Sequence, residues 1–208
     1  MRQFSLLFII IALSMATAAQ GNQQVPQKLN ELGLTFSNPD RFGLTYKTGR
    51  NQSLWRFHTF IASGNEQKVE ASDLYTEAKH SNHDYTVKIG RAKISELTED
   101  FEFRYGFDLF YSYSQDKDEI NIVNDGSPEQ LNKTILNRYG VNLVFGFHHR
   151  INNRILIGAE FLPHFSYRSG TSESYASYEI YDPEKRDISG YSYGFSNNSV
   201  QINLTYRF

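Results

Sequence analysis

The side chains of this 208-residue sequence that could do acid–base or metal chemistry are most concentrated in the segment DLYTEAKHSNHD. It places His80 and His83 near Asp73, Glu77 and Asp84. Imidazoles and carboxylates are the groups that hold a metal ion or act as acid and base in a hydrolase. Because their loose spacing fixes no geometry, we favour the alternative interpretation, a solvated external loop.

A second set of ionisable side chains occupies alternate positions inside apolar stretches, and signs are mixed along it. A pore would use such side chains as a selectivity lining, whereas a closed lumen would pair them, since buried charges need partners. We favour pairing. We expect His148 and His149 instead at a strand end on the periplasmic rim. The predicted lumen charge network comprises Lys47, Arg56, Lys88, Glu102, Arg104, Asp108, Glu160 and His164.

The elements that must position these residues are strands, because apolar and polar residues alternate with period two. The stretch FEFRYGFDLFYSYS (101–114) shows the alternation most clearly, and the last ten residues, SVQINLTYRF, show it without a fault. Further stretches cover 32–36, 42–46, 55–61, 85–89, 139–147 and 155–167. We therefore predict an all-β fold of eight antiparallel strands.

The connections between these strands predict an up-and-down barrel. Links 48–52, 95–100 and 151–154 are short, whereas 64–84, 115–137 and 168–196 are long and polar. Short periplasmic turns and longer extracellular loops are typical of transmembrane barrels. Residues 37–40 would form an unusually short first external loop. A final hairpin turning at Asn197 and Asn198 is the alternative arrangement, and Pro163 predicts a local bulge near the outer rim.

The apolar rows should face lipid, because eight strands enclose only enough room for side chains and could not hold so many large residues. A secreted, soluble sandwich with an apolar inner face on each sheet is the alternative. Aromatic residues collect at both ends of the strands, as in the girdles of membrane barrels. The outer girdle would be Tyr85, Tyr111, Tyr113, Tyr139 and Tyr167, and the lower one Trp55, Phe147, Tyr206 and Phe208.

Residues 1–19 are predicted to be a secretory signal peptide, because Arg2 precedes a short apolar run that is followed by small residues. Residues 20–30 would be a periplasmic leader and 31–208 the barrel. A net charge of -2 argues against nucleic acid as a partner. The absence of cysteine excludes disulfides and thiolate sites, and we expect no cofactor.

The ending is similar to the signal that the barrel-assembly machinery recognises in outer-membrane proteins. It has a terminal aromatic residue preceded by alternating apolar residues: Val200, Ile202, Leu204, Tyr206 and Phe208. With its whole mature length the chain resembles small outer-membrane β-barrels of the OmpA- and OmpX-like size class. The stretch RFGLTYKTG...LWRF is more loosely similar to the first hairpin of uncharacterised outer-membrane β-barrel domain proteins.

The resemblance implies a bacterial outer-membrane location, with membrane lipid, lipopolysaccharide and the secretion and assembly machinery as partners. The segment 168–196, rich in serine and tyrosine, and the segment 115–137 suggest contact with an extracellular ligand or surface partner. We therefore expect a non-enzymatic structural or interaction role. The alternatives are a membrane hydrolase or acyltransferase that uses loop His, Asp and Ser residues, and a narrow channel.

Overall fold

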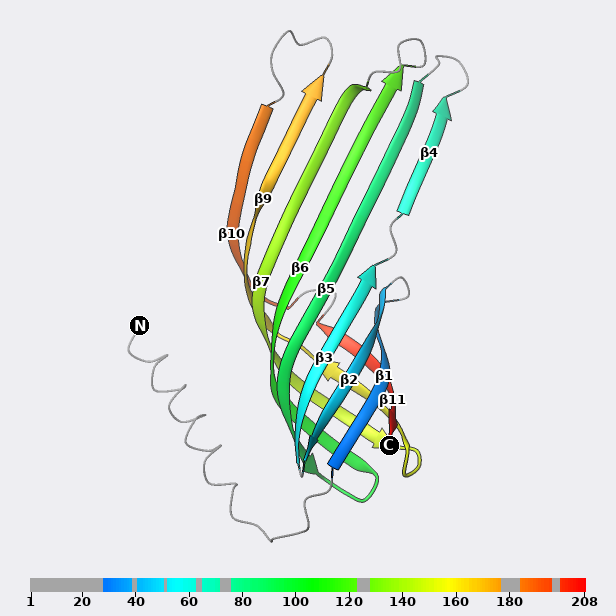
Figure 1. Ribbon diagram of the computed structural model, residues 1–208, viewed down its shortest axis with the longest axis vertical. Helices are drawn as coiled ribbons and strands as arrows, with labels where there is room; N and C mark the ends of the chain where they lie inside the picture. The colour runs from blue at the N-terminus through cyan, green and yellow to red at the C-terminus, as the bar shows by residue number, and fades with distance from the viewer. Residues whose placement is uncertain are drawn as a thin grey trace, which may run out of the picture.

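The computed structural model describes residues 28–38, 41–50, 52–62, 65–71, 76–122, 128–176, 184–195 and 199–208, which are organised as antiparallel strands (Figure 1). No helix within these ranges is long and apolar enough to cross a membrane. The strands are β1 (Lys28–Asn38), β2 (Arg41–Arg50), β3 (Ser53–Ala62), β4 (Asn65–Ala71), β5 (Thr76–Glu96), β6 (Phe101–Ile122), β7 (Pro128–Arg150), β8 (Ile155–Phe161), β9 (His164–Ala176), β10 (Glu184–Gly194) and β11 (Val200–Arg207).

Eight of these strands close into a ring, in the order β1-β2-β3-β5-β6-β7-β8-β11 and back to β1. The closing ladder joins the two ends of the described chain, from Glu31 opposite Arg207 to Phe36 opposite Ile202. A closed ring has no free edge, so every backbone group of the wall can find a partner without water. The predicted eight-stranded antiparallel barrel is confirmed, and the two-sheet sandwich is excluded.

Three strands of the ring, β5, β6 and β7, continue far beyond it and carry β4, β9 and β10 with them. The result is an open six-stranded sheet, β4-β5-β6-β7-β9-β10, that rises from one side of the barrel (Figure 1). The loop prediction for 64–84, 115–137 and 168–196 was therefore wrong for most of their length. Strands with two polar faces have no hydrophobic period by which a sequence could reveal them.

Pro163 separates β8 from β9 without a bulge in its own strand. The register against β7 is unchanged from Phe161 opposite Phe145 to His164 opposite Asn142, and Leu143 N–H still donates to the Pro163 carbonyl at 2.9 Å. The predicted bulge was thus wrong. The missing N–H instead marks the point where the neighbouring strand changes from β11 to β10.

The irregularity lies on that neighbouring strand. The β9–β10 ladder ends at the Gly194–His164 pair and the β8–β11 ladder at the Val200–Phe161 pair, so the sequence between these pairs is three residues longer on the side of β10 and β11. β10 pairs with β9, whereas β11 pairs with β8 and β1, so β10 and β11 do not form a hairpin. Asn197 and Asn198, the alternative turn, lie outside the described residues.

The facing of the side chains agrees with the predicted rows. Large apolar residues on the outside of the ring stay exposed, for example Leu143 at 50% and Phe147 at 59%, whereas the charged rows are buried inside. β1 begins at Lys28, so the barrel starts three residues before the predicted boundary at 31. The predicted leader was wrong for residues 28–30, because these residues extend the ladder with β2. Residues 1–19 lie outside the described ranges.

Leu143→Arg tests the outward face. It should destabilise the folded barrel in lipid by about 2–4 kcal/mol, the cost of a cation near the bilayer midplane. Asn142→Arg, one residue away and directed inward to a polar cavity, should cost less. Urea unfolding in lipid vesicles, followed by heat-shift gels, measures both. An equal or reversed ranking would contradict the facing.

Candidate functional site

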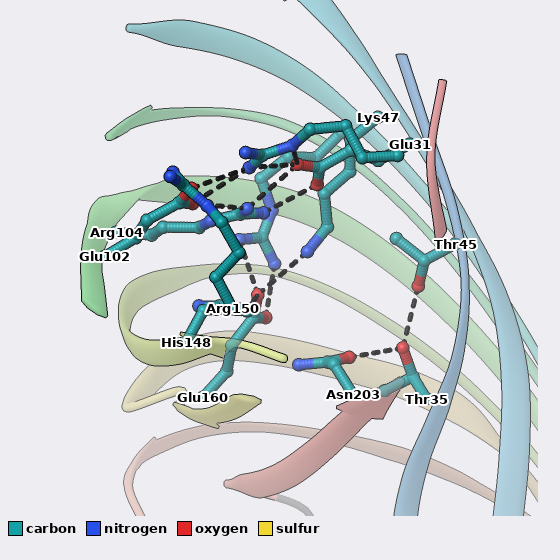
Figure 2. Close-up of polar contacts among 12 residues, drawn as sticks. Glu31, Thr35, Thr45, Lys47, Glu102, Arg104, His148, Arg150, Glu160 and Asn203 are labelled. Carbon is teal, nitrogen blue, oxygen red and sulfur yellow. Dashed lines mark hydrogen bonds and ion pairs between the residues drawn. The ribbon is translucent and has the colours of Figure 1, made fainter. Parts of the chain in front are cut away.

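The middle of the lumen is filled by charged side chains centred on Glu160 of β8 (Figure 2). Lys47 Nζ donates a hydrogen bond to Glu160 Oε1 at 3.1 Å, and the Arg56 guanidinium donates to Oε1 and Oε2 at 3.1 and 2.6 Å. Arg56 Nε also lies 3.1 Å from Asp108 Oδ1. All four side chains are at most 1% exposed. Two cations and two carboxylates thus form a layer that balances its own charge.

A second charged layer lies nearer the turn end of the barrel. Arg104 forms a bidentate pair with Glu31, at 2.7 and 2.9 Å, and also donates to Glu102 at 2.8 Å (Figure 2). Arg207 bridges the same two carboxylates, and Arg150 donates to Glu102 at 2.7 Å. Forked guanidinium–carboxylate contacts of this kind are the strong, geometrically specific form of ion pair. They join β1, β6, β7 and β11 across the lumen. We call the two charged layers together the plug.

A row of neutral hydrogen bonds continues from the first layer around the wall. The Arg56 guanidinium can only donate, so His58 Nε2 accepts from it at 3.1 Å, and His58 Nδ1 carries the proton toward Thr45 Oγ1 at 2.8 Å. Thr45 then donates to Thr35, which donates to Asn203 Oδ1 at 2.5 Å. The charged layer and this part of the wall therefore form one connected polar network.

Six of the eight residues predicted for the lumen network lie in these two layers. Lys88 and His164, the other two, line a cavity above them. The sequence analysis missed Glu31, His58, Arg150 and Arg207, although each stands on a polar row of its strand. The prediction of a rim position for His148 was wrong: its ring is buried, with Nε2 3.5 Å from Glu160 Oε1. His149 is the exposed member of the pair and lies against Phe101.

Gly158 explains why the lumen can hold the His148 ring. A Cβ at this position would lie 2.3 Å from His148 Cδ2, closer than real Cβ atoms come to other heavy atoms. A glycine beside a large ring is the small-next-to-large arrangement that fills a narrow barrel. The glycine can be read in the stretch RILIGAEF, but the sequence does not show that His148 of β7 lies opposite it.

The cavity above the plug, which we call the cup, has a volume of about 280 Å³. It is bounded by inward-facing side chains where the wall continues above the plug. Its charged members are Lys88, Arg138 and Arg168, with Asp84 as the carboxylate and His164 beside them. The remaining lining residues are Ser37, Thr86, Phe110, Ser112, Ser114, Leu136, Asn142, Leu162, Ser199 and Gln201.

The predicted outer girdle residues lie side by side on the outer wall. Tyr85 stacks on Tyr113 with ring centroids 5.1 Å apart, and Tyr111 lies 5.2 Å from Tyr139. Tyr139 stands opposite Tyr167, which contacts Tyr191 of β10, a member that the sequence analysis missed. Toward the turn end, four exposed aromatic side chains face outward: Trp55, Phe147, Tyr206 and Phe208.

The predicted assembly-signal residues Val200, Ile202, Leu204, Tyr206 and Phe208 are all exposed on the outer face of β11 or just beyond it. Phe208 N–H donates to the Asn30 carbonyl at 2.9 Å, which ties the last residue to β1. Their recognition by the assembly machinery stays a prediction.

The histidines first considered for chemistry lie on the extended sheet. His80 Nδ1 is 2.5 Å from Asp118 Oδ1 and 3.7 Å from Asp116 Oδ1, and the hydrogen bond with Asp118 raises the pKa of His80. His83 contacts Ser81 at 3.3 Å. Asp84 lines the cup, and the side chains of Asp73 and Glu77 lie outside the described parts. The imidazole of His80 thus pairs with carboxylates that the sequence analysis had not grouped with it.

A closed ring with charges inside, and an outer belt of exposed leucine, phenylalanine and tyrosine, defines an integral β-barrel of the outer-membrane type. Such a belt is stable only against lipid, since soluble proteins rarely expose continuous apolar surface of this extent.

Comparison with solved structures agrees with this class. The chain is similar to a major outer membrane protein from Thermus thermophilus, with a TM-score of 0.54, 11% identity, and coverage of 88% of this chain and 100% of that one. Weaker likenesses link it to CarO and CarO2 of Acinetobacter baumannii, with TM-scores of 0.35 and 0.36, identities of 9% and 10%, and coverage of 90% and 89% of this chain and 99% and 98% of theirs. No protein-family model and no curated protein matches the sequence.

Glu160→Gln tests the central layer. The change leaves Lys47 and Arg56 buried with only Asp108 to balance them, and should destabilise the barrel by about 3–5 kcal/mol, the usual cost of breaking a buried pair. Glu173→Gln is the matched control, because it breaks a partly exposed pair with Lys185 on the extended sheet and should cost about 0–1 kcal/mol. Urea unfolding in vesicles measures the loss of stability in both variants. A similar loss in the two would contradict the burial of the Glu160 ion pairs.

Proposed function

We propose that this protein is a non-conducting outer-membrane scaffold of the OmpA- and OmpX-like size class, whose extended sheet presents a binding surface on the extracellular side. The observation that carries the proposal is the combination of a filled lumen and a tall polar sheet above it. The filled lumen argues against a pore. The tall polar sheet provides a surface that a simple membrane anchor would not need.

The filled lumen supports the absence of conduction. Arg56, Arg104 and Glu160 each have at most 1% of their surface exposed, and their charged groups are engaged in ion pairs that cross from wall to wall. An ion that passed would have to displace these contacts one layer after another. Ions cross a pore quickly only where binding is weak enough to release them.

The extended sheet supports the interaction role. Its strands pair over long distances, for example from Thr76 opposite Ile122 to Glu96 opposite Glu102 in the β5–β6 ladder. A paired sheet holds its side chains in fixed positions, so a ligand meets an ordered surface rather than a loop that must be ordered on binding. Charged residues, serine, asparagine and glutamine dominate it, a composition suited to polar contacts.

We propose no catalytic step. His80 is engaged by Asp118, and His83 by Ser81, so the two histidines have separate partners on the sheet.

Planar-bilayer recording tests the first half of the proposal. The wild-type barrel should give no unitary conductance under conditions in which a general porin, inserted by the same procedure, conducts. Reproducible conductance steps in the wild type that disappear on boiling the sample would overturn the non-conducting scaffold.

A trimmed variant tests the second half. Replacing residues 63–83, 116–134 and 171–187 each by Asn-Gly should shorten the sheet at positions that already face one another, such as Gln115 and Ile135. The ring should stay folded by heat-shift gel, but retention on a lipopolysaccharide-coated sensor should fall at least tenfold relative to the full barrel. Equal retention would show that the extension is not the binding surface.

A further inference from the structure

We propose that the cup above the plug is a binding site for a small anionic saccharide, a sugar ring that carries a phosphate or carboxylate group. The inference rests on the proposed interaction role of the extracellular side and names a ligand class for it. Four features of the cup support it: its charge, its unpaired floor, its apolar wall and its size.

The charge of the cup points to an anion. Arg138 of β7 and Arg168 of β9 stand directly opposite each other in the ladder, and both line the cavity. Neither forms an ion pair or side-chain hydrogen bond within the described part of the chain. Like charges that face each other across two strands destabilise a sheet. A bound oxyanion between the two guanidinium groups would turn this repulsion into two charge-assisted contacts.

The floor of the cup points to a ligand with hydroxyl groups. Gln201 is only 2% exposed, and its Oε1 has no hydrogen-bond partner among the described residues; Ser37 Oγ is also buried without one there. A buried amide oxygen needs a donor, and leaving it without one is costly. A carboxylate or a fully ionised phosphate group has no proton to donate to it, whereas a sugar hydroxyl has one. Ser112 and Ser114 add hydroxyl groups on the wall.

The shape and size of the cup further limit the class of ligand that fits it. Phe110 stands opposite Gly140 and lines the wall with Leu136 and Leu162, which offers an apolar surface to the C–H face of a ring. The volume of about 280 Å³ lies at the lower end of the range for small-molecule sites, roughly 300–1,000 Å³. A single substituted sugar therefore fits better than an oligosaccharide.

Such a ligand has two natural sources. It could be a soluble sugar acid or sugar phosphate, or a charged saccharide of the surrounding lipopolysaccharide that reaches the cup from the membrane surface. The recognised chemistry is the same, an oxyanion next to ring hydroxyls.

Calorimetric titration of the full barrel in detergent with glucose 1-phosphate, glucose and inorganic phosphate tests the site. Glucose 1-phosphate should bind at least tenfold more tightly than either of the others, because only it offers both an oxyanion and a sugar ring with its hydroxyl groups. Arg138→Gln and Arg168→Gln should each weaken its binding at least tenfold. Lys133→Gln, which removes the same charge from β7 on the opposite face of the sheet, should leave binding unchanged.

A second readout separates a binding role from a structural one. Without ligand, Arg138→Gln and Arg168→Gln should raise the thermal unfolding temperature, since each removes a repulsion; a lower temperature would show that the pair stabilises the wall and would overturn the proposal. Undetectable binding, equal affinity for glucose or for phosphate, or unchanged affinity in both arginine variants would also overturn it.

The source is found by repeating the titration in phosphatidylcholine vesicles with and without lipopolysaccharide. Competition identifies the membrane saccharide as the occupant, and its absence identifies a soluble one. The trimmed variant keeps all cup residues, so loss of retention on lipopolysaccharide there, with glucose 1-phosphate binding intact, distinguishes the two proposals.

Discussion

The constraint on which this structure depends is that charge inside a narrow, closed barrel must be neutralised where it stands. Lipid surrounds the wall and eight strands leave no water-filled middle, so each ionised side chain in the lumen must find its counter-charge within a few ångströms. Four carboxylates, Glu31, Glu102, Asp108 and Glu160, meet five cations there, Lys47, Arg56, Arg104, Arg150 and Arg207. The pairs join distant strands and so also fasten the ring from within.

That neutralisation has a consequence for where function can reside. In the proposed non-conducting scaffold, the paired charges of the lumen do not serve a passing ion or substrate, and an outer face in lipid offers only apolar surface. The accessible polar surface is therefore found above the ring, on the cup and the extended sheet. The extension is one-sided, because β1 and β2 have only 11 and 10 residues whereas β5, β6 and β7 have 21, 22 and 23.

The sequence predicted the parts of the fold that depend on period two. Rows such as Leu143, Phe145 and Phe147 can belong only to a strand with an apolar face, and the ring follows from eight of them. The extended sheet was not predictable in this way, because in a stretch such as Asp116, Lys117 and Asp118 both faces are polar and the alternation carries no signal.

The site was predictable in composition but not in geometry. Arg104 and Glu160 were expected inside because a charge on the polar row of a strand whose other face meets lipid can only point into the lumen. Glu31 was missed because the apolar row of its strand was recognised only from Leu32 onward, and His148 because its burial depends on Gly158 of the next strand. The pairing of Arg138 with Arg168 arises from the register of two strands that are far apart in the chain, which no local pattern contains.

The plug and the cup differ in one electrostatic respect that follows from their positions. The plug lies deep in the wall and is balanced nearly within itself, so it does little to cancel the positive charge above it. The cup has Arg138, Arg168 and Lys88 against Asp84, and the β-strands of the wall surround it on its sides. Low-dielectric walls focus the field of such a cluster toward its open side instead of dissipating it. A nearly balanced plug below a cationic cup therefore directs the potential of the barrel outward, to the side where an anion would approach.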